Sequence, residues 1–207
     1  FTAMPSYLDG SLWLAAASGT VGVFLSILLH ELGHASVARL HQVGVAEVVV
    51  GGFFGYASLK RQAIPRKFRI RILAAGPFTN LVIFTVLWGA LAVLSSQGAD
   101  VLHRAGAPLS WQVETLRALA IVNLAMFVFN LVPAFPLDGG KILGLWLDRS
   151  LPLQTSLRIV SALGVAFGIV MIFLGLGISL FLSFIGALVI AANLRRLHRA
   201  ADSRKSA

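Results

Sequence analysis

Five long apolar stretches dominate the sequence and decide what this chain can fold into. A helix needs about 20 apolar residues to cross a bilayer, and each stretch meets or nearly meets that length. In the whole chain 57% of the residues are hydrophobic and only 12% are charged, which excludes an ordinary soluble domain. We therefore predict an all-α polytopic membrane protein with about five transmembrane helices, within Leu12 to Leu40, Ile70 to Leu94, Thr115 to Val132, Ile159 to Leu174 and Ile178 to Leu194.

Two shorter segments refine this prediction. Only Gly175-Leu176-Gly177 separates the last two stretches, so we expect a C-terminal helical hairpin over 159–194 with its tight turn at these glycines. Val45 to Leu59 is rich in β-branched and aromatic residues with glycines in the middle, which predicts a small membrane-associated β-hairpin. Two roles remain open for this hairpin: its edge receives an extended substrate by strand addition, or it packs against the helices.

The net charge of +9 comes from basic residues in alternate connections between the apolar stretches. These groups lie within Arg39 to Arg71, within Lys141 to Arg158, and in the tail 195–207. By the positive-inside rule they are cytoplasmic, and Phe1 lies on the opposite side. The basic charge therefore indicates membrane topology and contact with the lipid bilayer, and we expect no nucleic acid partner.

The first apolar stretch carries the motif His30-Glu31-Leu32-Gly33-His34 near its cytoplasmic end. Residues four apart on a helix lie on one face, so His30 and His34 can hold one metal ion, with Glu31 beside it. Ionisable residues are costly inside a membrane and are therefore functional candidates. The chain has no cysteine, which excludes thiolate ligands and disulfides. The pattern indicates a zinc hydrolase.

A second polar motif follows the third stretch, at Asn130-Leu131-Val132-Pro133-Ala134-Phe135-Pro136-Leu137-Asp138-Gly139-Gly140. Catalytic zinc commonly has three protein ligands, and Asp138, at the same membrane depth as the histidines, is our third ligand. We expect Gly139 and Gly140 to form a tight turn that lets Asp138 face the first motif. For Asn80, in the second stretch, we favour a role in helix packing over a role in the site.

Together these motifs make the chain resemble the site-2 protease family of intramembrane zinc metalloproteases. The first matches the family's H-E-x-x-H and the second its N-x-x-P-x-x-P-x-D-G, so the resemblance covers residues 12–141 of a single domain spanning 1–207. It implies one Zn²⁺ per chain and hydrolysis of peptide bonds within or near transmembrane segments of another protein, such as a tethered regulator. It also implies a bacterial or archaeal cell membrane, and it names neither the substrate nor an oligomeric state. Members usually have a further span before the first motif, so we expect Phe1 not to be the true start.

In the mechanism that follows, Glu31 is the general base and Asn130 donates a hydrogen bond to the oxyanion. A zinc-bound water has a pKa of about 7, so hydroxide is available at neutral pH. Two alternatives stay open. A membrane zincin of another type would cut peptides outside the membrane and use a downstream glutamate in place of Asp138. A non-proteolytic protein would use the histidines to transport or sense a metal.

Overall fold

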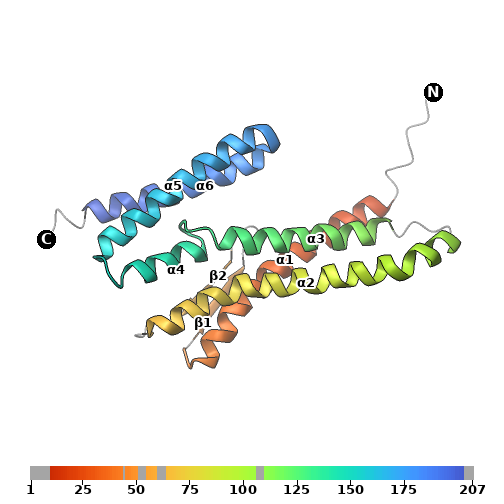
Figure 1. Ribbon diagram of the computed structural model, residues 1–207, viewed down its shortest axis with the longest axis horizontal. Coiled ribbons are helices and arrows are strands. Elements are labelled where there is room, and N and C mark those ends of the chain that lie inside the picture. Colours follow the sequence, from red (N-terminus) through yellow and green to blue (C-terminus); the bar gives the residue numbers. More distant parts are fainter. Residues whose placement is uncertain (1–9, 44, 51–54, 60–63, 106–109, 203–207) are drawn as a thin grey trace. The chain divides into compact units, whose positions relative to one another are not determined.

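The computed structural model describes residues 10–43, 45–50, 55–59, 64–105 and 110–202. Its regular elements are almost all helical, which confirms the predicted class (Figure 1). In chain order they are α1 (Gly10–Leu40), β1 (Val45–Val50), β2 (Gly55–Leu59), α2 (Arg66–Ala105), α3 (Ser110–Asn130), α4 (Asp138–Leu147), α5 (Leu153–Ile178) and α6 (Leu180–Asp202).

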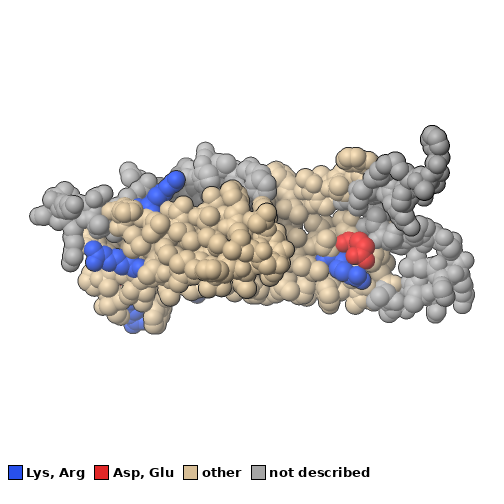
Figure 2. Space-filling view, turned by 90° about the horizontal axis from the view of Figure 1, so that it is seen from above, with Lys and Arg blue, Asp and Glu red and all other residues tan. Residues whose placement is uncertain are grey.

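Five of these helices, α1, α2, α3, α5 and α6, are long and apolar enough to cross a membrane, as predicted. The ten residues of α4 are too few to cross, and the sequence did not suggest this helix. Large apolar side chains lie on the surface, among them Trp13, Phe173 and Ile178, which are more than 70% exposed. The face drawn in Figure 2 shows few charged side chains among the described residues. Such a surface is stable in lipid, and the chain is a multi-pass membrane protein.

The chain divides into two compact units, which are described separately. The first contains α1, both strands, α2 from Phe78 onward and most of α3. Strands β1 and β2 form an antiparallel pair in which Val48 lies opposite Ala57 and Val50 opposite Gly55, and α1 contacts both strands. The predicted pair of strands is therefore confirmed. The glycines expected at its turn, Gly51 and Gly52, lie outside the described residues.

The second unit contains the start of α2, the end of α3, and α4, α5 and α6. Helices α5 and α6 form the predicted hairpin, but the predicted position of its turn is wrong. Gly175 to Gly177 still belong to α5, and the chain reverses at Ser179, whose extended backbone donates to the Gly175 carbonyl at 2.8 Å. Any side chain at Gly175 would collide with Ser183 of α6. This glycine therefore serves close packing of the two helices.

Candidate metal centre

The first unit supplies the two histidines from the last third of α1. His30, Glu31 and His34 are 5%, 6% and 8% exposed. The Nε2 atoms of His30 and His34 are 3.2 Å apart, and their rings meet edge to face. Two nitrogens that share a tetrahedral zinc ion at about 2.0–2.1 Å lie about 3.3 Å apart. The spacing of the pair therefore fits one ion held by both Nε2 atoms.

The other ring nitrogen of His30 has its own partner. Its Nδ1 lies 2.5 Å from Oδ1 of Asn80, which is completely buried in α2. Metal-binding histidines commonly donate their second N–H to an oxygen in this way, which fixes the ring and directs the free nitrogen to the metal. Sequence analysis favoured packing for Asn80 over a role in the site. Its only signal was a polar residue inside an apolar helix, and that signal did not identify His30 as its partner.

The second unit supplies Asp138, the first residue of α4. Its side chain is buried, and its Oδ1 accepts a hydrogen bond from Nζ of Lys141 at 2.9 Å. An acidic residue in the first turn of a helix is also favoured by the helix dipole. The carboxylate is thus held in one place by charge and by local structure.

The predicted turn at Gly139 and Gly140 is wrong, because both residues are helical and lie in the first turn of α4. A side chain on Gly139 would collide with the backbone of Leu131 and Val132, and one on Gly140 with the backbone at Ala134. The two glycines therefore let α4 start directly against the loop 131–137. They fix Asp138 by close approach of two backbone segments.

Helix α6 supports the same loop from its other side. Nδ2 of Asn193, a fully buried residue, donates to the carbonyl oxygen of Phe135 at 2.6 Å. The guanidinium of Arg196 lies 4.2 Å from the centroid of the Phe135 ring. Sequence analysis gave this helix no role in the site, and its polar residues gave no indication of their partner.

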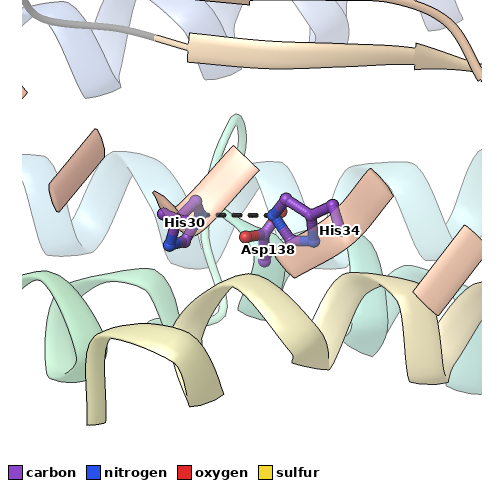
Figure 3. A group of neighbouring side chains, drawn as sticks. All are labelled: His30, His34 and Asp138. Carbon is purple, nitrogen blue, oxygen red and sulfur yellow. Dashed lines mark hydrogen bonds between the residues drawn. The ribbon is translucent and has the colours of Figure 1, made fainter. Parts of the chain in front are cut away.

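Three side chains form a group that could hold a metal ion. One ligand atom from each of His30, His34 and Asp138 lies within 4.8 Å of the other two, and all three residues are buried (Figure 3). Two imidazole nitrogens and one carboxylate oxygen are a donor set typical of catalytic zinc, which keeps a further position for water. The residues that the sequence predicted as ligands thus fit that metal.

The roles of Glu31 and Asn130 remain predictions. Glu31 is buried next to His30 on α1, where the motif placed it. Asn130 is the half-buried last residue of α3. Helix α3 ends at Asn130, and residues 131–137, which form turns, connect it to Asp138.

Comparison with known proteins agrees with this arrangement. Peptidase family M50 matches residues 18–110 and 101–175. A zinc metalloprotease of Methanocaldococcus jannaschii is 33% identical over 154 residues, covering 74% of this chain and 41% of the relative. Rip3 of Mycobacterium tuberculosis is 38% identical over 140 residues, covering 66% of this chain and 33% of that protein.

A solved structure, the site-2 protease from Methanocaldococcus jannaschii, is similar to this fold with a TM-score of 0.64 and 27% sequence identity. The match covers 92% of this chain and 86% of the solved chain. By contrast, the match spans less than half the length of the two relatives above. Since the family match extends over well more than half of the sequence and includes both polar motifs, the chain belongs to peptidase family M50.

Proposed function

We propose that this chain is an intramembrane zinc metalloprotease of the site-2 type, which hydrolyses peptide bonds within or near transmembrane segments of other membrane proteins. The observation that carries the proposal is the buried group of His30, His34 and Asp138, with Glu31 beside it on α1. The relatives' zinc metalloprotease names and the similarity to a solved site-2 protease support the same conclusion.

One Zn²⁺ held by His30, His34 and Asp138 would supply a Lewis acid and an activated water at neutral pH. Glu31 accepts the proton of the attacking water and delivers it to the leaving amine nitrogen. The burial of Glu31 excludes bulk water, and this strengthens the charge interactions around the scissile bond. The buried pair of Nε2 atoms needs no side-chain rearrangement to receive the ion, since its spacing already fits.

The substrate in this proposal is a helix of another membrane protein, such as a tethered regulator. A helix in lipid keeps its carbonyl groups in intrahelical hydrogen bonds, so the substrate must unwind locally before hydrolysis. The basic connections that contain Arg39 and Lys141 support a position of the centre near the cytoplasmic face of the membrane. Water then reaches the site from the cytoplasm.

Metal removal tests this function directly. Purified protein in detergent should cut a substrate protein that has one transmembrane helix, and mass spectrometry should place the cut inside or next to that helix. A chelator should stop cleavage, and added zinc should restore it. Cleavage confined to soluble peptides would favour a membrane zincin of another type, and cleavage that survives complete metal removal would contradict the proposal.

Asn130 is proposed to donate its side-chain N–H to the oxyanion that forms on the substrate carbonyl. Asn130→Ala should therefore keep zinc and lose about a hundredfold or more in the rate of cleavage. The measurement is the single-turnover rate together with zinc content. Thr85→Val, which removes a hydroxyl bonded only within its own helix, is the control. A full rate in Asn130→Ala would remove this residue from the site.

A further inference from the structure

We propose that three buried residues of the first unit, Ser26, Asn123 and Asn80, form a one-directional hydrogen-bond relay that sets the tautomer of His30. The inference rests on the proposed zinc site for its purpose, but the relay itself is a property of the chain alone. Asn80 and Asn123 act as positioning residues, since they reach the metal centre only through His30.

The relay connects three helices by contacts between side chains of residues that are at most 5% exposed. At one end of the relay, Nδ1 of His30 bonds Oδ1 of Asn80. Nδ2 of the same Asn80 side chain donates to Oδ1 of Asn123 at 2.9 Å. Asn123 Nδ2 then donates to Ser26 Oγ and to the carbonyl oxygen of Leu119, each at 2.9 Å. Ser26 Oγ donates to the carbonyl oxygen of Gly22 at 2.8 Å.

The direction of the relay follows from the two backbone carbonyls, of Leu119 and Gly22, that accept hydrogen bonds at the end far from His30. A carbonyl oxygen has no proton to donate, so Asn123 must present its NH₂ group to Leu119. Likewise Ser26 has one proton, which goes to Gly22, so its oxygen is an acceptor for Asn123. Both amide protons of Asn123 are then used, and only its oxygen faces Asn80.

The same constraint passes through Asn80 to the metal centre. Asn80 must give its NH₂ group to Asn123, and its second amide proton points to the sulfur of Met126 at 3.8 Å. Its oxygen is thus the atom that faces His30 Nδ1. An oxygen acceptor requires that Nδ1 carry a proton, and a neutral imidazole carries only one. Therefore Nε2 of His30 is unprotonated and can act as an acceptor or a metal ligand.

An unprotonated Nε2 is the form of His30 that a metal ion needs. Nε2 of His30 faces Nε2 of His34 at 3.2 Å, on the side of the ring opposite Asn80. In the other tautomer a proton would occupy the metal-binding position, and Asn80 would face an unprotonated nitrogen. To reverse the relay, Asn123 would have to turn its oxygen toward the Leu119 carbonyl, leaving buried donors and acceptors unpaired. The fold thus keeps His30 in its metal-binding form before an ion arrives.

Histidine NMR tests the relay in the wild-type protein. The full chain contains five histidines, so ¹⁵N-histidine labelling gives few signals, and the signal that disappears in His30→Gln identifies this residue. In metal-free protein, at a pH where the imidazole is neutral, the ¹⁵N shifts should show the proton on Nδ1 of His30. A proton found mainly on Nε2 would overturn the proposal.

Variants then separate the relay from simple packing. Asn123→Leu and Asn80→Leu should let His30 populate the other tautomer and should weaken zinc binding about 10- to 100-fold, measured by competition with a chromophoric chelator. Asn80→Asp keeps the shape and an acceptor for Nδ1–H, so it should retain the wild-type tautomer. Thr85→Val, in the same helix as Asn80, should change neither measurement.

The outcomes also distinguish this relay from the proposed function. If Asn123→Leu keeps the wild-type tautomer and zinc affinity, or if Asn80→Asp loses the tautomer as Asn80→Leu does, the relay is wrong even when the protein is an active protease. If wild type shows the predicted tautomer yet binds no zinc, the proposed function fails while the relay stands. The wild-type spectrum decides the point even where a variant does not fold.

Discussion

Glu31→Gln should bind zinc like the wild type and yet fail to cut a transmembrane substrate. Glutamine has the shape of glutamate but cannot accept a proton, so the attacking water loses its base. General acid–base catalysis contributes about 10²- to 10⁴-fold, and Glu31 is proposed to act in both proton transfers, so we expect a loss near the upper end of that range. The measurements are zinc content and single-turnover cleavage, with both proteins prepared in the same detergent.

The matched control for this experiment is Glu114→Gln. Glu114 is an exposed glutamate whose carboxylate pairs with Arg117 at 3.1 Å on α3, so the same chemical change is made away from the metal centre. This variant should cut like the wild type. If Glu31→Gln cleaves at the wild-type rate, Glu31 is not the base. If wild type and variant both bind zinc and neither cuts any of several transmembrane substrates, the results favour a non-proteolytic metal protein.

Asp138→Ala should lose zinc itself. Removing the carboxylate leaves only the two imidazoles of His30 and His34 as protein ligands, fewer than the three that catalytic zinc sites commonly use. Since disturbing an outer-shell partner already weakens binding about 10- to 100-fold, loss of a direct ligand should exceed about 100-fold. Zinc content after dialysis and a chelator titration measure the effect, and cleavage should disappear with the metal.

Asp148→Ala provides the control for Asp138→Ala. Asp148 is the C-cap residue of the same helix, α4, so both variants remove one carboxylate from one ten-residue helix. Zinc affinity should change only in Asp138→Ala. Retained zinc and activity in that variant would mean that the third ligand lies elsewhere, as in zincins that use a downstream glutamate.

Much of the fold could be predicted because lipid imposes a simple rule on the sequence. Apolar length alone predicted five spans, and the third, expected to end at Val132, ends at Asn130, shortly before Pro133. The metal-binding residues could also be predicted, because a pair of histidines four residues apart is costly inside an apolar stretch and therefore indicates a function. In these cases local composition determines the structure.

Other features depend on residues that are distant in sequence, and they were missed or misread. The glycines at 139, 140 and 175 look like turn residues, yet each one is helical and allows close approach of another segment. Asn123 was not singled out, because a polar residue in a span gives no sign of its partner. It bonds Asn80, 43 residues earlier, and Ser26, 97 residues earlier.

The contacts of α6 with Phe135 restrict which substitutions this chain can accept. Lipid-facing positions of α5 and α6 can exchange one apolar residue for another with little effect. The position of Asn193 is different, because its amide fills the space that a side chain at Gly164 would need while it bonds the Phe135 carbonyl. Substitutions at Gly164 and Asn193 are therefore expected to be correlated among homologues, because a change at either one alters the bond that ties the C-terminal hairpin to the loop before Asp138.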